Sequence, residues 1–258
     1  MSGPAARIVT LSPHLTELAY AAGAGDKLVA VARYSDYPPA ARALPQIGDA
    51  SLVDLERVAA LGPDLVLAWK SGNSPADIAS LERLGLRVHV SEAARLGDVP
   101  RVLRAIGELA GTMQAAERQV AQFEREIGEL RERYAGRPPL RVFYQIWDRP
   151  LLTVNGRHII SDVLSLCGGV NVFARAALLT PSVSVEALVA AHPEVVVGGS
   201  SSSSPGELAA QWHALPVAAL TRLPVVAVPP DLIQRQTPRI AEGAALICRR
   251  LEEVRASR

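Results

Sequence analysis

Apolar residues recur at three- and four-residue spacings in a long stretch near the middle of the chain. The residues of this apolar face are Met113, Val120, Phe123, Ile127, Leu130 and Tyr134. That period is typical of one face of an α-helix. Thr112 is a suitable N-cap, and Gly136 followed by Pro138 is a suitable stop. At about 1.5 Å per residue, the pattern predicts a rod roughly 35 Å long.

On either side of this helix, short apolar runs alternate with helical patterns. The predicted strands before it are ARIVTL, LVAVA (28–32), the run 64–69 and LRVHVSE, and those after it are LRVFYQIW (140–147), the run after Glu194 and PVVAVPP. Helical patterns separate them, and a last helix is predicted from about Pro238 to Arg255. Strands that alternate with helices are typical of parallel α/β sheets.

The two halves of the chain repeat one another. Glu56 lies seven residues before Pro63, and Glu186 lies seven residues before Pro193. Each proline is followed by an acidic residue and an apolar strand. The central helix alone would also fit the surface of a single α/β domain, but the repeat favours two lobes of one plan. We therefore predict an α/β protein with two Rossmann-like βα lobes (1–111 and 137–258), one long backbone helix (112–136) and a ligand cleft between the lobes.

Composition narrows the function classes. The 258 residues are 49% hydrophobic, and 27 basic against 26 acidic residues give a formal net charge of +1. Without a basic block, we expect no nucleic-acid partner. No apolar run approaches the length of a membrane span, and no signal peptide is visible at the N-terminus. The residues alone leave Cys167 and Cys248 open between a disulfide and two buried thiols.

Aromatic residues gather in segments that follow predicted strands. Tyr34, Tyr37, Trp69 and Trp147 all lie there. In parallel α/β sheets, ligands bind outside the carboxyl ends of the strands. Because aromatic planes offer a large contact area at little entropic cost, this set predicts a site for a flat ligand.

Catalytic and metal-binding motifs are missing from the sequence. It has no dinucleotide or P-loop glycine pattern, nucleophile elbow, H-E-x-x-H or C-x-x-C. Its five histidines are scattered, so we predict no metal site. His14 is expected to be a solvated loop residue, with contact to a ligand or a metal as the second interpretation. The serine run between Gly198 and Gly206 is predicted to be a flexible surface loop rather than a phosphate cradle.

Several longer segments carry a family resemblance. They are LSPHLTELAYAAG, YSDYPP, DLERVAALGPDLVLAWKSGN, SLCGGVNVF, SVSVEALVAAHPEVVV and TPRI. From Arg7 to about Leu251 the chain resembles the cobalamin-binding periplasmic components of ABC-type vitamin importers. The resemblance implies a periplasmic, monomeric binding protein that is not an enzyme, has no cofactor, and delivers a corrinoid to a membrane permease.

The same resemblance gives roles to single residues. Tyr34 matches a tyrosine that contacts the corrin, and a ligand-contacting loop is matched by Asp231, Leu232, Ile233, Gln234 and Arg235. Glu56 and Glu186 match two glutamates that meet permease arginines, while Cys167 and Cys248 match paired cysteines. With Trp69, Trp147 and His14, these residues make up the predicted ligand and docking sets.

The sequence also departs from the family pattern. Where cobalamin-binding members of the family carry aromatic residues, this chain has Ala50, Thr180 and Leu232-Ile233. In the strand that starts the second lobe, Ile146 replaces a further aromatic residue of the family, and Trp147 follows one place on. The thinner aromatic lining leaves four kinds of ligand open, namely cobalamin, a corrinoid without its lower base, haem and a ferric siderophore. An α/β enzyme acting on a phosphorylated substrate is the competitor from another class, and the missing phosphate loop and nucleophile–base pair argue against it.

Overall fold

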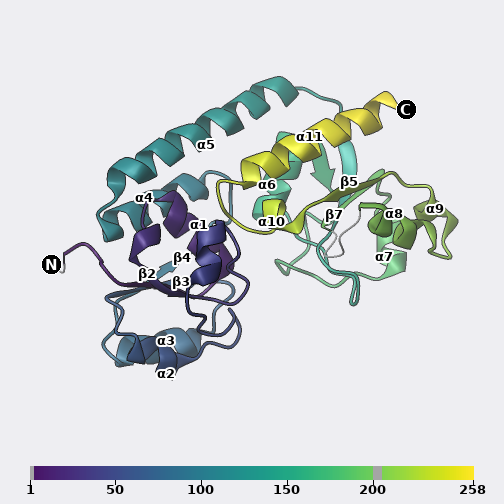
Figure 1. Ribbon diagram of the computed structural model, residues 1–258. Helices are drawn as coiled ribbons and strands as arrows, with labels where there is room; N and C mark the ends of the chain where they lie inside the picture. Colours follow the sequence, from purple (N-terminus) through teal and green to yellow (C-terminus); the bar gives the residue numbers. More distant parts are fainter. Residues whose placement is uncertain (1–2, 200–204) are drawn as a thin grey trace. The chain divides into compact units, whose positions relative to one another are not determined.

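The computed structural model of the chain describes residues 3–199 and 205–258, in two compact units. The first unit runs to Ala93 and includes Gly97–Glu124, and the second contains Ala94–Leu96 and Arg125–Arg258. The division falls inside the long helix α5, Met113–Tyr134. Each unit is a parallel α/β lobe (Figure 1). The serine run predicted to form a flexible loop lies outside the described residues.

The first lobe is a four-stranded parallel sheet in the order β2-β1-β3-β4. Its elements are β1 (Ile8–Thr10), α1 (Pro13–Ala21), η1 (Gly25–Lys27), β2 (Leu28–Val31), η2 (Pro39–Ala43), α2 (Leu55–Ala60), β3 (Leu65–Trp69), α3 (Pro75–Arg83), β4 (Val88–Ser91) and α4 (Asp98–Ala110). Helices α1 and α4 cover one face of the sheet, and α2 and α3 cover the other (Figure 1). The central strands are therefore buried on both sides, which explains their uninterrupted apolar runs.

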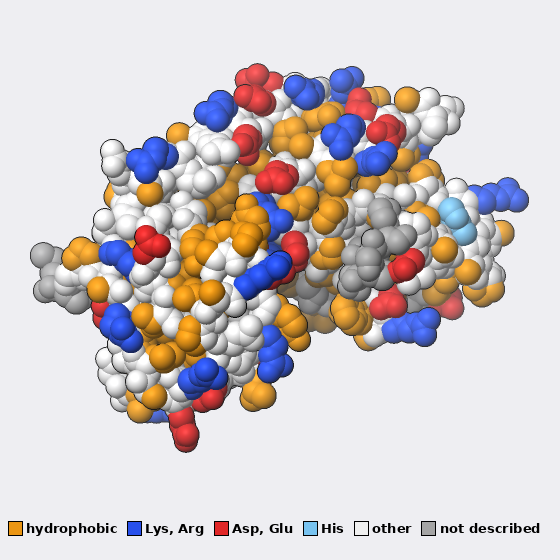
Figure 2. Space-filling model, viewed as in Figure 1, with side chains coloured by type: hydrophobic (Ala, Val, Ile, Leu, Met, Phe, Trp, Pro, Cys, Tyr) orange, Lys and Arg blue, Asp and Glu red, His pale blue; other side chains and the backbone are white. Residues whose placement is uncertain are grey.

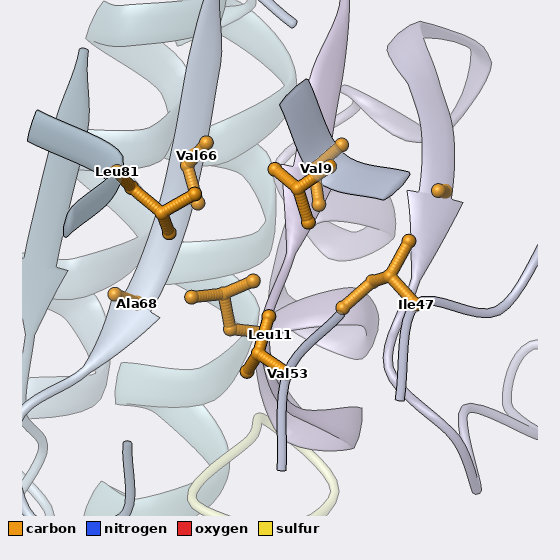
Figure 3. Packing of buried hydrophobic residues seen from close by; sticks show 9 residues of the cluster. Val9, Leu11, Ile47, Val53, Val66, Ala68 and Leu81 are labelled. Carbon is orange, nitrogen blue, oxygen red and sulfur yellow. The ribbon is translucent and has the colours of Figure 1, made fainter. Parts of the chain in front are cut away.

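The core between the first sheet and helices α2 and α3 is built from aliphatic side chains (Figure 3). Val9 and Val66 point into it from the two central strands, and Leu81 enters from α3. All three side chains are completely buried. This packing fixes the short helix α2 against the sheet through Val58.

The second lobe repeats the plan with the order β6-β5-β7-β8. Its elements are β5 (Leu140–Gln145), α6 (Ile159–Leu166), β6 (Gly169–Asn171), α7 (Val185–Ala190), β7 (Val195–Gly199), α8 (Pro205–His213), α9 (Ala218–Thr221), β8 (Val225–Val228), α10 (Pro230–Ile233) and α11 (Ile240–Ala256). All neighbouring strands are parallel. Phe143 and Trp212 pack at the centre of its core with ring centroids 5.6 Å apart.

An arginine at the start of the first lobe secures the carboxyl end of α2. Arg7 donates through Nε to the carbonyl of Gly62 at 3.2 Å and through its terminal nitrogen to that of Leu61 at 2.6 Å. The Asp64 carboxylate in turn accepts hydrogen bonds from the backbone N–H groups of Ala6 and Arg7. Since a helix leaves its last carbonyls without partners, these bonds satisfy groups that would otherwise be orphaned.

The second lobe uses the same device for α7. Arg141 donates to the carbonyls of Ala191 and His192, and Glu194 accepts from the Arg141 backbone N–H at 2.6 Å. His192 has φ of 44°, close to the 55° of Gly62 at the matching position of the first lobe. A left-handed backbone is uncommon outside glycine. The repeat seen in the sequence is therefore a repeat of backbone conformation and of hydrogen bonding.

Helix α5 follows the predicted pattern along most of its length. Its buried side chains are Ala116, Val120, Phe123, Ile127, Leu130 and Tyr134. Met113, which the pattern assigned to this face, is 39% exposed, and Ala116 is fully buried one turn further on. A Cβ on Gly107 would lie 2.6 Å from that of Ala116, so α4 and α5 approach closely at this point. Acidic and basic side chains intersperse on the exposed face of α5 (Figure 2).

The sequence patterns do not predict strand β6 or helix α10, and one predicted strand is longer than the observed one. Helix α6 ends before Gly168, which has a left-handed φ of 72°, and Gly169 then begins strand β6 beside β5. The segment after β8 was expected to be a loop and contains α10. The strand predicted over 140–147 ends at Gln145, since Trp147 turns back in an isolated bridge to Leu152.

A disulfide joins Cys167, at the end of α6, to Cys248 in α11, which confirms the pairing that the family resemblance implied. Both cysteines are completely buried, and their Cα atoms lie 4.6 Å apart. Within the described residues, no helix combines the length and apolarity that crossing a membrane requires.

Removing the disulfide should destabilise the second lobe. On the chain-entropy model, a cross-link over 81 residues is worth about 4 kcal/mol. We expect the Cys167→Ala/Cys248→Ala variant to lose roughly that much free energy of unfolding in a denaturant titration. An equal loss when the wild-type protein is reduced is the control, and a loss under about 1 kcal/mol would contradict the model.

Acid should weaken the same lobe through His158. This half-buried residue caps α6 because its Nδ1 accepts from the Ile160 N–H at 3.2 Å, and burial lowers the pKa of His158 to about 4. In the unfolded chain His158 binds a proton near pH 6.5, whereas in the folded chain it stays neutral down to about pH 4. The free energy of unfolding is therefore highest above pH 6.5 and falls as the pH drops towards 4.

The expected loss is at most about 3 kcal/mol. His158→Asn keeps a good N-cap without a titrating ring, so the fall in unfolding free energy between pH 6.5 and 4 should shrink in this variant. Identical pH profiles for the variant and the wild-type protein would show that His158 does not cause it.

Candidate ligand-binding and docking residues

Tyr34 is presented on a strained turn of the first lobe. Its φ is 68°, a left-handed conformation that bulky residues seldom adopt, and its side chain is 67% exposed. The next residue, Ser35, is buried and shares a hydroxyl contact of 2.9 Å with Thr16, which in turn contacts Thr10 at 2.7 Å. This buried chain of hydroxyls anchors the turn while the ring points to solvent. Strain of this kind is often retained where it serves a function.

Trp69 closes strand β3 and is wrapped by the residues that follow it. A Cβ on Gly72 would lie 1.8 Å from the indole ring, so only glycine lets the backbone pass there. The backbone N–H of Trp69 donates to the Asn73 side chain at 2.7 Å. Asn73 in turn donates to the carbonyls of Leu11 and Ala50. One asparagine thus ties three segments at the carboxyl edge of the first sheet.

The expectation that His14 is a solvated loop residue is wrong. Pro13 occupies the first turn of α1, where its fixed φ favours a helix, so His14 is helical. The imidazole is only 7% exposed, and its Nδ1 lies 3.0 Å from the Ser12 hydroxyl oxygen. It meets the Trp69 ring edge-on, with centroids 4.9 Å apart. The structure therefore brings His14 and Trp69 together, with His14 supporting the indole.

The predicted residues of the second lobe lie in two places. Trp147 is 53% exposed, and its indole N–H donates to the Arg149 carbonyl at 3.0 Å. In the segment after β8, Asp231 and Arg235 form an ion pair of 3.0 Å across one turn. Arg235 is the more buried partner, with 14% of its side chain exposed against 50% for Asp231.

The remaining members of that segment differ in access. Ile233 is completely buried, which leaves its side chain no surface for a ligand, while Leu232 and Gln234 are half-buried. Burial raises the pKa of Tyr144, and the Gln234 amide works in the opposite direction. Gln236 and Thr237 follow directly, and each keeps a buried oxygen without a hydrogen-bond partner among the described residues. Gln236 and Thr237 lie outside the ligand set that the sequence predicts, because burial gives no local sequence signal.

A pocket of about 420 Å³ opens within the second lobe, beside the segment that follows β5. Its walls include Leu188, Trp212 and Leu220, and Arg149 and Gln145 contribute polar groups. The Trp212 indole N–H donates to Gln145 Oε1 at 2.7 Å, which fixes both side chains. No motif marked this pocket, since its residues come from segments far apart in the sequence.

Glu56 and Glu186 occupy equivalent positions. Each is exposed and stands second in a six-residue helix, Glu56 in α2 and Glu186 in α7. The Asp54 carboxylate caps α2 by accepting a hydrogen bond from the Arg57 backbone N–H. The Ser184 hydroxyl oxygen caps α7 by accepting one from the Ala187 backbone N–H. The backbone N–H of Glu186 and the Ser184 hydroxyl lower the pKa of Glu186. Both carboxylates also suit the positive end of the helix dipole.

Comparison with known proteins agrees with this architecture. The model of a family described as "Periplasmic binding protein" matches residues 8–215. The chain is 36% identical over 245 residues to a vitamin B12-binding protein of Vibrio cholerae, covering 95% of this chain and 88% of the relative. A vitamin B12-binding protein of Yersinia pestis is 37% identical to this chain over 250 residues, and the match covers 97% of this chain and 88% of that relative.

Solved structures agree as well. The crystal structure of the periplasmic vitamin B12-binding protein BtuF of Vibrio cholerae matches with a TM-score of 0.89 at 35% identity, over 98% of both chains. A periplasmic heme-binding protein from Pseudomonas aeruginosa matches with a TM-score of 0.81 at 26% identity, over 95% of this chain and 91% of that one. This chain therefore belongs to the periplasmic binding protein family.

Proposed function

We propose that this protein binds a corrinoid, with cobalamin as the first candidate, in the periplasm and delivers it to the permease of an ABC importer. The observation that carries the proposal is its similarity, over nearly the whole chain, to two vitamin B12-binding proteins. The protein acts by binding and release rather than by catalysis, and we propose that it does so as a monomer. The cleft expected between its lobes stays a prediction.

The candidate residues fit a flat, largely apolar ligand with polar side groups. Tyr34 offers an exposed ring on an anchored turn, and Trp147 offers a second in the other lobe. Trp69 is held in place by His14 and Asn73. Asp231 and Arg235 supply hydrogen-bonding groups to amide substituents. Each of these roles is part of the proposal.

Haem is the alternative ligand, since a relative of the same fold is described as heme-binding. A corrinoid and haem would contact Tyr34 through different parts of its side chain. A corrinoid would use the face of the ring, whereas haem iron would take an axial ligand, either the Tyr34 phenol oxygen or the His14 imidazole. Tyr34 is the better candidate because it is 67% exposed, whereas His14 is only 7% exposed. Tyr34 variants therefore distinguish the two.

Titration with cobalamin, cobinamide and haem tests the proposal. We expect calorimetry and absorbance to show tight binding of a corrinoid. Tyr34→Gly should weaken this binding about tenfold or more, because glycine accepts a φ of 68° and so only the ring is lost. Tyr34→Phe should bind a corrinoid nearly as well as the wild-type protein, since it keeps the ring face.

Two results would contradict the proposal. One is the absence of corrinoid binding at tens of micromolar. The other is a Soret shift with haem that Tyr34→Phe abolishes, which would instead favour the haem alternative.

The docking role is tested separately. Replacing both Glu56 and Glu186 by Arg turns attraction to a basic permease surface into repulsion, so transport into reconstituted vesicles should fall at least tenfold. Corrinoid affinity should not change, because neither side chain belongs to the proposed ligand set. Glu82→Arg, an exposed charge reversal in α3, is the matched control. Unchanged transport by the double variant would remove the docking role.

A further inference from the structure

Five buried polar side chains form one hydrogen-bonded network at the carboxyl edge of the first sheet. They come from the end of β1, the start of α1 and the turn after β2, and none is more than 7% exposed: Thr10, Ser12, His14, Thr16 and Ser35. The core cluster of this lobe, by contrast, is aliphatic. Buried polar groups cost free energy unless they are bonded, and apolar side chains of the same shape would often stabilise a core as well. Stability alone therefore does not explain why this network is polar.

Thr16 lies at the centre of the network and uses its full hydrogen-bonding capacity. Its hydroxyl oxygen lies 2.7 Å from that of Thr10, 2.9 Å from that of Ser35 and 3.3 Å from the Ser12 carbonyl oxygen. A hydroxyl has one donor and two acceptor lone pairs. Because a carbonyl oxygen can only accept, the Thr16 O–H donates to Ser12. The hydroxyls of Thr10 and Ser35 then donate to Thr16, so each bond in this part of the network has one direction.

One arm of the network leads from Thr16 to Tyr34. Ser35 follows Tyr34 directly, and its backbone N–H donates to the Ala32 carbonyl at 3.3 Å. The Ser35 hydroxyl is bonded to Thr16. The left-handed backbone of Tyr34, with φ of 68°, is thus held by the residue that follows it. The exposed Tyr34 ring therefore projects from a fixed turn.

The other arm leads from Thr16 to Trp69 through the first turn of α1. The Ser12 carbonyl accepts from the Thr16 hydroxyl at 3.3 Å and from the Thr16 backbone N–H at 3.2 Å. The Ser12 hydroxyl oxygen lies 3.0 Å from His14 Nδ1, and the His14 ring meets the Trp69 indole edge-on with centroids 4.9 Å apart. Thr16 is therefore connected to two aromatic residues of the proposed ligand set.

We propose that Thr16 is a positioning residue, which holds Tyr34 and Trp69 as one preformed pair of ligand contacts. Hydrogen bonds have preferred angles as well as distances, so this network fixes how each ring is presented, whereas apolar contacts alone would let the ring shift. A contact that is already ordered loses less conformational entropy when a flat ligand binds. The inference rests on the proposed function, because the corrinoid is what gives these two rings a shared role.

Thr16→Val tests this inference, because valine keeps the branched shape of threonine and lacks the hydroxyl. Cobalamin and cobinamide binding should weaken about tenfold in calorimetry, while Thr16→Ser, which keeps the hydroxyl, should stay within about threefold of the wild-type protein. In ligand-free protein labelled with fluorotyrosine and fluorotryptophan, the fluorine NMR signals of Tyr34 and Trp69 should both broaden or split in Thr16→Val. Thr112→Val is the matched control. The Thr112 hydroxyl oxygen is also buried but has no hydrogen-bond partner among the described residues, so neither measurement should change.

A double-mutant cycle separates positioning from a general loss of stability. Ser35→Ala removes only the arm towards Tyr34 and should weaken corrinoid binding about fivefold in the wild-type background. In the Tyr34→Gly background the same change should have less than about a twofold effect, because the ring that Ser35 positions is gone. The cycle decides the question even if Thr16→Val does not fold, since Ser35→Ala leaves no hydroxyl donor of the network without its acceptor.

The outcomes separate this inference from the proposed function. Unchanged fluorine signals in Thr16→Val, with corrinoid binding by the wild-type protein intact, would overturn the positioning role and leave the proposed function standing. Equal effects of Ser35→Ala in both backgrounds would do the same, because Ser35 would then act through the stability of the fold. A wild-type protein that binds no corrinoid, although both fluorine signals change in Thr16→Val, would overturn the proposed function and support the common anchoring of the two rings.

Discussion

Burial of the central strands on both faces is the constraint on which the rest of the structure depends. In the first lobe β1 and β3 are covered by helices on either side, and in the second β5 and β7 are covered in the same way. A strand that is buried on both faces carries few polar side chains, so the residues that can contact a ligand lie beyond its ends. Because all the strands of a lobe are parallel, the loops after them share one edge. Tyr34, Trp69 and Trp147 all lie in or beside such connections.

The duplicated plan gives the two lobes equivalent short helices that are secured in the same way. Arg7 and Arg141 secure the carboxyl ends of α2 and α7, and a side-chain cap secures each amino end. Helices of six residues are too short to be stable by themselves in water. Pinned at both ends and packed on a sheet, they can hold Glu56 and Glu186 in fixed positions.

Local devices differ where the two lobes differ. The first lobe orders the turn at Leu52 with one carboxylate, whereas the second orders the segment around Leu178 with Asn155 and Arg157. At the helix ends, Gly62 and His192 hold the same left-handed conformation, although only glycine adopts it without strain. A shared conformation with different residues is what is expected when backbone geometry, rather than side-chain identity, is the constraint.

The sequence by itself determined the alternation of strands and helices, the long amphipathic helix and the repeat that relates Glu56 to Glu186, because each is a periodic or local pattern. It did not determine that His14 is helical and packed on Trp69, that Ile233 is buried, or that Gly169 begins an edge strand. Only the tertiary structure decided those, along with the pocket around Trp212 and the support of Tyr34 by Thr16 and Ser35. The physical reason is that burial and partnership depend on residues distant in the chain, which no local pattern encodes.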